Sequence, residues 1–126
     1  MKFIHSAVRV SAEEEAKAFY EGLLCLNLVV EYKGERNLMR KLFGVDKEFL
    51  IKLYDVGGVF LEVFVGDGGE KVPSVSHICF QVKDRENLKK RAEKMGFKVV
   101  KIKRAGKSDL LFIYDRDGNG FEIKEE

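Results

Sequence analysis

The chain repeats one pattern of predicted secondary structure, and this internal repeat restricts its fold more than any other feature. Each half is about 60 residues long and consists of strand, helix, strand, strand and strand. In the first half the predicted strands are 3–10, 26–32, 48–54 and 58–65, and the predicted helices are 12–24 and a short one at 37–43. In the second half the predicted strands are 75–83, 97–104, 110–114 and 120–124, and the predicted helix is 85–95. The repeat predicts an α+β protein made of two tandem βαβββ modules.

The boundaries of the modules follow from local signals. Residues 66–74 contain three glycines and the one proline of the chain, which predicts a linker. The linker divides the chain into a first module at 1–65 and a second at 75–126. Ser11 and Glu14 have the spacing of a capping box, which predicts that the first helix begins at Ser11. We expect the two modules to form a single domain.

Composition excludes several classes of protein. Among 126 residues, 23 Lys and Arg stand against 21 Asp and Glu, and no basic stripe suggests a nucleic-acid partner. No apolar run approaches the ~18 residues of a membrane helix, and the first residues lack a signal-peptide pattern, so we expect a cytoplasmic chain. Cys25 and Cys79 are too few for a disulfide scaffold and are expected to be buried thiols. The abundance of Lys and Glu is thermophile-like.

Four polar residues occupy matching places in the two halves. His5 and His77 each lie in the first strand of a module, and Glu62 and Glu122 each lie in the last. Because side chains alternate across a strand, these four oppose the apolar residues suited to packing under a helix. The four side chains are therefore expected on the sheet face that the helix leaves uncovered.

This set of side chains suits a divalent metal. Two neutral imidazoles and two carboxylates match the ligands of a borderline cation, and two carboxylates buried together without a cation would be costly. The alternative for each histidine is a hydrogen-bonded structural residue, and for each glutamate a half-exposed surface residue. The duplication of all four residues favours the metal.

These features together resemble the vicinal oxygen chelate superfamily, which includes glyoxalase I, fosfomycin-resistance proteins, extradiol dioxygenases and bleomycin-resistance proteins. The run 19–24 is similar to its Phe-Tyr-x-x-x-Leu-Gly signature, with Cys25 in place of the glycine, and the run 115–122 is similar to its ending. The resemblance implies that the two modules form an open, curved mixed β-sheet barrel around a metal site. It implies the ligands His5, Glu62, His77 and Glu122.

The resemblance is greatest to glyoxalase I, the lactoylglutathione lyase. It implies a divalent-metal-dependent lyase or isomerase, with Ni, Zn, Co, Mn or Fe, acting through a metal-stabilised enediolate on a small oxygenated metabolite. Glu122 is the first candidate for the catalytic base and Glu62 the second. One alternative is a methylmalonyl-CoA-epimerase-like enzyme or another enzyme of the superfamily. The other is a metal-free, bleomycin-resistance-like binding protein.

Further residues are candidates for contact with the substrate. Arg9 matches an arginine that binds a substrate carboxylate in glyoxalase I, and its alternative role is a structural cation. Phe60, Phe64 and Tyr114 are expected to line an apolar cavity, or else to be ordinary core. Cys79 shares the face of His77 and is expected to line the pocket. The expected partners are a small-molecule substrate and a second copy of the chain in a homodimer, with no nucleic acid and no membrane.

Overall fold

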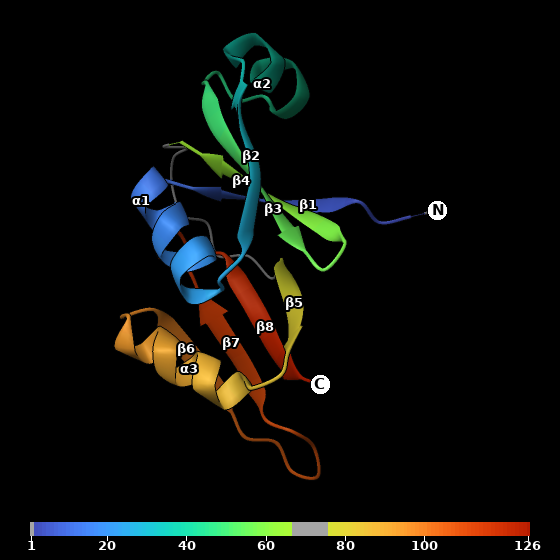
Figure 1. Cartoon of the computed structure of the whole chain (residues 1–126), viewed down its shortest axis with the longest axis vertical. Helices are drawn as coiled ribbons and strands as arrows, with labels where there is room; N and C mark the ends of the chain where they lie inside the picture. The colour runs from blue at the N-terminus through green and yellow to red at the C-terminus, as the bar shows by residue number, and fades with distance from the viewer. Residues whose placement is uncertain (1, 67–75) are drawn as a thin grey trace. The chain divides into compact units, whose positions relative to one another are not determined.

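The structure, a computed structural model, describes residues 2–66 and 76–126. The chain separates into two compact units, and residues 2–66 belong to the first while residues 76–126 belong to the second (Figure 1). Most of the predicted linker at 66–74, from residue 67 onward, lies outside the described residues. The linker and the module boundaries therefore remain predictions.

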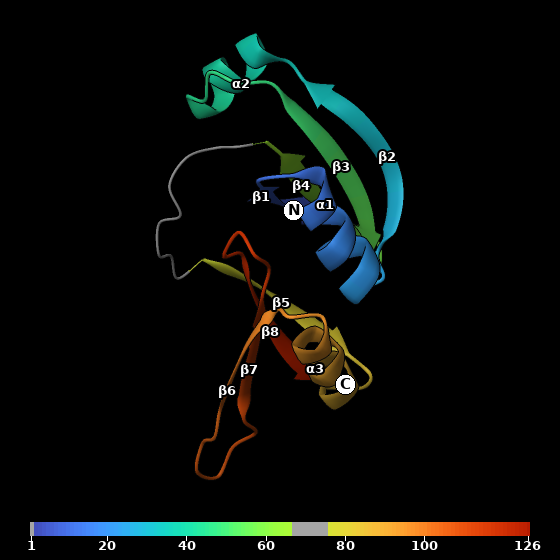
Figure 2. The ribbon, with the colours of Figure 1, turned by 90° about the vertical axis from the view of Figure 1, so that its left-hand side faces the viewer.

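The first module is a four-stranded mixed sheet with helices. Its elements are β1 (His5–Val10), α1 (Glu13–Ala16), η1 (Lys17–Leu23), β2 (Asn27–Gly34), α2 (Arg36–Phe43), β3 (Phe49–Val56) and β4 (Val59–Val65). The strand order is β1-β4-β3-β2, in which β1 runs parallel to β4 and the other pairs are antiparallel. Figure 2 shows that β2 and β3 are long and curved, with α2 at their shared end.

The second module repeats this topology. Its elements are β5 (His77–Val82), α3 (Arg85–Lys94), β6 (Lys98–Ile102), β7 (Leu110–Tyr114) and β8 (Gly120–Glu125). The strand order is β5-β8-β7-β6, and β5 again runs parallel to β8. Asp84 caps α3 by accepting a hydrogen bond from the Asn87 backbone N–H, at 2.9 Å. Two βαβββ modules, each with one mixed sheet, are therefore confirmed.

Each module has an apolar core between its sheet and a helix, because alternate strand residues face the helix. In the first module this core contains Val10, Ala16, Phe19, Tyr20, Leu23, Tyr54, Leu61 and Val63. In the second module it contains Leu88, Ala92, Leu111, Ile113, Phe121 and Ile123. One face of each sheet is thus covered by helix, and the residues of the opposite face are available for a site.

A buried lysine lies on the helix-covered face of the first sheet. The Lys52 side chain is only 1% exposed, and its Nζ lies 3.1 Å from Glu21 Oε1, 3.3 Å from Glu31 Oε1 and 3.5 Å from Glu13 Oε1. The Tyr54 hydroxyl also donates to Glu21 Oε1, at 2.9 Å. One lysine and three glutamates therefore connect α1, η1 and β2 to the middle of β3. A lysine in a strand would by itself indicate no more than a surface residue.

The first helix differs from the predicted 12–24 helix in two ways. The capping box is wrong, because the helix begins after Ala12, whose carbonyl accepts from the Glu15 and Ala16 backbone N–H groups at 3.2 and 3.3 Å. Only residues 13–16 are α-helical, and η1 is a π-helix whose end is marked by the bond from Leu24 N–H to Phe19 O, at 2.9 Å. Glu21 lies within this π-helix, and its carboxylate is the one 3.1 Å from Lys52 Nζ.

The residue after this helix has a left-handed backbone. Cys25 has φ 55°, and it is the non-glycine residue with positive φ in the described part of the chain. A residue with a Cβ is strained in this region, whereas glycine adopts it without steric cost. The glycine of the superfamily signature thus has a conformational explanation at this position.

Replacing Cys25 with glycine should therefore stabilise the protein. Relief of the backbone strain, less the extra entropy that glycine gives the unfolded chain, should add about 0.5–1 kcal/mol to the free energy of unfolding. Urea unfolding measures the change, and Cys25→Ala is the matched control because it removes the thiol but keeps the Cβ. Equal stability of the glycine and alanine variants would contradict the explanation.

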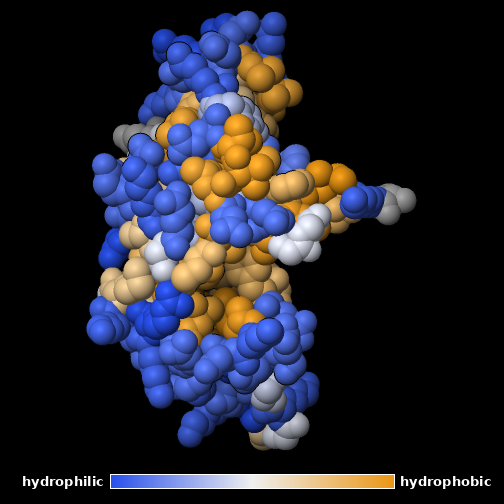
Figure 3. All heavy atoms as spheres, in the orientation of Figure 1, coloured by the Kyte–Doolittle hydropathy of each residue, from blue (hydrophilic) through white to orange (hydrophobic). Residues whose placement is uncertain are grey.

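The exposure of the cysteines and of several apolar residues differs from expectation. Both Cys25 and Cys79 are exposed, so the prediction of two buried thiols was wrong. Figure 3 shows hydrophobic side chains among the polar ones on the surface. On β2, an outer strand of its sheet, and on α2, the exposed large apolar residues are Leu28, Val29, Val30, Tyr32, Leu38, Leu42 and Phe43. Among the described helices, none has the length and apolar character needed to cross a membrane.

Candidate metal centre

The first module brings one predicted histidine and one predicted glutamate together. Because β1 and β4 are paired in parallel, His5 lies opposite Phe60 and Ala7 lies opposite Glu62, so the two polar side chains share one face of the sheet. His5 Nε2 is 3.6 Å from Glu62 Oε2. The glutamate side chain is 16% exposed and the histidine 49% exposed, so the carboxylate is largely covered while the imidazole remains accessible.

The second module forms the same pair with the same geometry. His77 in β5 lies opposite Gly120, and Cys79 lies opposite Glu122 in β8. His77 Nε2 is 3.6 Å from Glu122 Oε2, and the two side chains are 42% and 16% exposed. The two modules therefore agree in strand pairing, in the atoms that face each other, in distance and in exposure.

Both pairs lie on the face opposite α1, η1 and α3, and in the first module α2 covers one end of that face. Leu61 and Val63, the neighbours of Glu62 in β4, are buried in the core, and Lys52, the partner of Val63 in β3, contacts the helix. Phe121 and Ile123, the neighbours of Glu122, are likewise buried. We call the face that carries the His–Glu pair the open face of each sheet.

Glu62 has an additional partner that sequence reasoning missed. The Tyr32 hydroxyl donates a hydrogen bond of 2.6 Å to Glu62 Oε1. Burial raises the pKa of Tyr32 to about 12, and the hydrogen bond and the negative charge of Glu62 act in the same direction. A β-bulge between Leu28 and Val30 changes the alternation of β2, so the sequence pattern does not reveal which face Tyr32 occupies.

Glu122 has different neighbours. Its Oε1 lies 3.7 Å from Lys124 Nζ, and Lys124 is 63% exposed. The Cys79 thiol is hydrogen-bonded to Glu122, and partial desolvation together with the charge of Glu122 raises the pKa of this thiol. The ring of Phe112 is 5.2 Å from that of His77 and limits its movement on one side.

The turn before β8, the strand that carries Glu122, explains why residues 115–122 resemble the ending of the superfamily. Asp115 is 4% exposed, and its Oδ1 accepts the backbone N–H groups of Asp117 and Asn119 at 3.0 and 2.8 Å. Its Oδ2 accepts the Asn119 side-chain amide at 2.7 Å, and Gly118 supplies a φ of 87°. These bonds fix the connection between β7 and β8, and with it the position of β8.

The predicted substrate residues have varied environments. Arg9 is exposed on β1, and half-buried Phe60 lies opposite His5 in the strand register. Half-buried Tyr114 stacks near Phe112 at 6.2 Å and lies over Gly120, where an added Cβ would meet the ring at 3.0 Å. Phe64, the remaining aromatic candidate, belongs to the core instead, because α2 folds over that end of the sheet and encloses it with Met39, Phe49 and Ile51.

The donor types fit a divalent cation, with two donors from each module. Imidazole nitrogen and carboxylate oxygen are ligands for Ni, Zn, Co, Mn and Fe. Within residues 2–66 and 76–126, no group of three or more His, Cys, Asp or Glu residues is placed to hold a metal. The four-ligand site implied by the sequence therefore remains a prediction, whereas its two halves are each formed.

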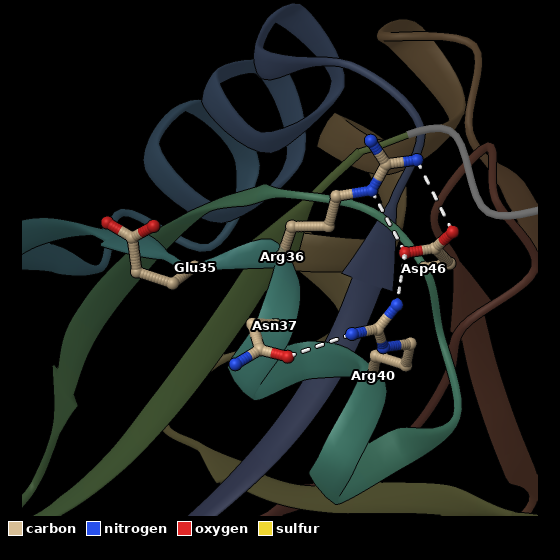
Figure 4. Close-up of a pocket in the computed structure, with 5 residues that line it drawn as sticks. All are labelled: Glu35, Arg36, Asn37, Arg40 and Asp46. Atoms are coloured by element: carbon tan, nitrogen blue, oxygen red, sulfur yellow. Dashed lines mark hydrogen bonds and ion pairs between the residues drawn. The ribbon is translucent and has the colours of Figure 1, made fainter.

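A separate pocket lies at the beginning of α2 and contains none of the predicted site residues. It has a volume of about 570 Å³ and is lined by Glu35, Arg36, Asn37, Arg40 and Asp46 (Figure 4). Arg36 Nε is 2.9 Å from Asp46 Oδ1, and the Arg40 guanidinium donates to Asn37 Oδ1 at 3.0 Å. These bonds tie the segment after α2 back to the helix, which is a structural role.

Comparison with known families identifies the class of protein. Residues 2–123 match the model of the Glyoxalase/Bleomycin resistance protein/Dioxygenase superfamily. The match covers almost the whole chain. The chain belongs to this superfamily. No curated protein gives a significant match.

Solved structures show the same fold at low sequence identity. A glyoxalase family protein from Bacillus cereus has a TM-score of 0.79 and 18% identity, covering 100% of this chain and 94% of its own. The trypanothione-dependent glyoxalase I of Leishmania major has a TM-score of 0.76 and 19% identity, covering 100% and 87%. The E126Q mutant of the fosfomycin resistance protein FosX from Listeria monocytogenes, complexed with Mn(II) and 1S,2S-dihydroxypropylphosphonic acid, has a TM-score of 0.73 and 19% identity, covering 98% and 90%. At these identities the likeness concerns the fold.

Proposed function

We propose that this protein is a divalent-metal-dependent enzyme, a glyoxalase-I-like lyase or isomerase of a small oxygenated metabolite. The observation that carries the proposal is the duplicated His–Glu pair, with Nε2 and Oε2 3.6 Å apart on the open face of both sheets. A structural role for one strand histidine would not require the same partner, distance and exposure in the second module. The Mn(II) complex of FosX supports metal binding on this fold.

The proposed ligands are His5, Glu62, His77 and Glu122, and the two sheets would form the barrel that holds one ion. The ion would supply Lewis-acid activation of two neighbouring substrate oxygens. A carboxylate would remove a proton from the carbon that bears one of these oxygens and return it to the adjacent carbon that bears the other. Glu122 is the proposed base, and Glu62 is the second choice.

Several side chains would complete the substrate site. Arg9 would attract a carboxylate of the substrate, and Phe60, Tyr114 and Cys79 would cover its apolar part on the open faces. The expected assembly is a homodimer, a state that the apolar residues exposed on β2 and α2 support. The proposed location is the cytoplasm.

Metal titration tests the proposal. Protein purified without a histidine tag and stripped with a chelator should bind about one equivalent of Ni, Zn, Co or Mn per chain. The loaded protein is then assayed with the methylglyoxal–glutathione hemithioacetal and, in parallel, for methylmalonyl-CoA epimerisation. Turnover of the first substrate supports the glyoxalase-like reaction, and turnover of the second alone would assign the epimerase instead.

The stoichiometry decides between an enzyme and a metal-free binding protein. Less than about 0.2 equivalents of every metal would contradict the metal-dependent enzyme and favour the bleomycin-resistance-like alternative. Glu48→Gln is a suitable control, because it removes an exposed carboxylate that pairs with Lys33 at 3.0 Å and precedes β3, whereas Glu62 lies beside Leu53 farther along that strand. That variant should bind as much metal as the unaltered protein.

A further inference from the structure

The two His–Glu pairs agree in geometry, but their glutamates are held differently. Glu62 Oε1 accepts the Tyr32 hydroxyl at 2.6 Å, while Oε2 faces His5. Glu122 Oε1 has Lys124 Nζ at 3.7 Å, which is beyond hydrogen-bond distance, while Oε2 faces His77. The Glu62 carboxylate is thus held by a short, charge-assisted bond from a hydroxyl, whereas Glu122 has the weaker donor of the Cys79 thiol and an exposed lysine nearby.

The bond from Tyr32 requires a side chain of particular length. Tyr32 pairs with Ile51 and Glu62 pairs with Leu53, so β3 lies between the two residues in the sheet. The tyrosine must therefore extend across a whole strand to reach the carboxylate. Strand pairing alone does not create such a contact.

The second module has no equivalent side chain at the matching position. In the first sheet, Leu53 pairs with Glu62 on one side and with Val30 on the other. In the second sheet, Phe112 pairs with Glu122 on one side and with Val100 on the other, so Val30 and Val100 occupy matching positions. Tyr32 follows Val30 by two residues, and Ile102 follows Val100 by the same step. An isoleucine has no hydroxyl, so the duplication of the sheet does not extend to this donor.

We propose that Tyr32 is a positioning residue for Glu62. Its hydroxyl would hold Oε1 in place, so that Oε2 keeps a fixed orientation beside His5 Nε2 and the two atoms can bind the metal together. This inference rests on the proposed metal site. It assigns different tasks to the two glutamates. Glu62, oriented by the Tyr32 hydroxyl, would serve as a fixed ligand, and Glu122, which lacks such a strong donor, would serve as the base. Hydrogen bonds that orient ligands in this way typically affect metal affinity.

The test compares two tyrosines of the same sheet. Tyr32→Phe removes the donor to Glu62, and the matched control Tyr54→Phe removes a 2.9 Å hydrogen bond to Glu21 on the helix-covered face. Metal affinity is measured by competition with a chelator, and the ligand environment by the visible absorption spectrum of the Co(II) form. Urea unfolding of the metal-free proteins shows whether each variant is folded.

Tyr32→Phe should lower metal affinity by about tenfold and change the Co(II) spectrum. Tyr54→Phe should leave both unchanged while lowering the urea midpoint, because its bond belongs to the core network. Suppose that the unaltered protein binds metal and that the folded Tyr32→Phe variant binds it with the same affinity and the same Co(II) spectrum. That result would overturn the positioning role and leave the proposed function standing. An unaltered protein that binds no metal would overturn both, and the first titration would already reveal it.

Discussion

Replacing either His5 or His77 with alanine should remove metal binding, with the same loss from both positions. In each pair the histidine Nε2 lies 3.6 Å from the glutamate Oε2. The proposed ion would need the donors of both pairs. Loss of one neutral nitrogen donor leaves two carboxylates and one imidazole, and the affinity should fall by about 100-fold or more. Chelator competition measures the affinity, and atomic absorption of the purified protein measures the metal content.

The stoichiometry of these variants separates one shared site from two independent sites. A shared site predicts that each variant falls from about one equivalent to almost none. If His5→Ala instead kept half of the bound metal, with the remainder lost in the double variant, each module would bind its own ion and the shared site would be wrong. Glu48→Gln serves again as the control for loss of an unrelated carboxylate.

Mixing the two variants shows whether the pairs of one site come from one chain or from two. If each site combines a first module with the second module of another chain, a mixed dimer of His5→Ala and His77→Ala contains one site with every ligand intact. Random subunit exchange in an equimolar mixture makes about half of the dimers mixed, so metal binding should return to about one quarter of all sites. If both pairs come from the same chain, mixing restores nothing.

Replacing Lys52 with methionine should destabilise the protein strongly. The ammonium group is buried and lies within 3.5 Å of three glutamates, which are left without their shared cation in the variant. Removing one partner of a buried ionic network while the others remain costs about 3 kcal/mol. Urea unfolding at neutral pH measures the loss, and metal affinity of the folded variant should be unchanged because Lys52 lies on the helix-covered face.

The pH dependence gives a second measure of the same network. Burial acts to lower the pKa of Lys52, but hydrogen bonds and charges from Glu21 and Glu31 outweigh it, and the net pKa is raised above 10.5. A raised pKa in the folded state contributes stability that is fully present below pH 10.5 and is lost as the pH rises through the folded value. Burial also raises the pKa of Tyr54, so this group likewise contributes stability that is lost as the pH rises.

The unaltered protein should therefore lose more stability than Lys52→Met between pH 9 and pH 12, a range that brackets the ordinary lysine value of about 10.4. Lys33→Met is the matched control, because it removes an exposed lysine that pairs with Glu48 at 3.0 Å. Its unfolding curve should match that of the unaltered protein at neutral pH. Equal stability of the Lys52 and Lys33 variants would contradict the role assigned to the buried network.

Alternation along single strands predicted much of the fold and of the candidate site. His5 and Glu62 were assigned to the same face because period-two patterning is local, and the parallel pairing of β1 with β4 then brings them together. The superfamily resemblance supplied the four-ligand hypothesis. These predictions depend only on residue order within a strand and on repetition.

Features that depend on tertiary contact were not predictable in this way. A lysine in a strand normally indicates surface, and the contact of Lys52 with Glu21 of the π-helix depends on how that helix packs on the sheet. For Phe64 the sequence left cavity lining and ordinary core open, and the choice between them depends on α2, which packs over this side chain. The β-bulge hides the orientation of Tyr32, because one extra residue reverses the alternation of the following side chains.

The parallel pairing of β1 with β4, and of β5 with β8, has a consequence for folding. In each module it joins the first strand to the last, so each His–Glu pair is the contact between the ends of the module's chain segment. Contacts between residues so distant in sequence require closure of a long loop, and they form after the local hairpins. A module whose last strand has not yet been synthesised has its histidine but not the facing glutamate. Because the proposed ion would need both pairs, its capture would report that the last strand of each module has been added.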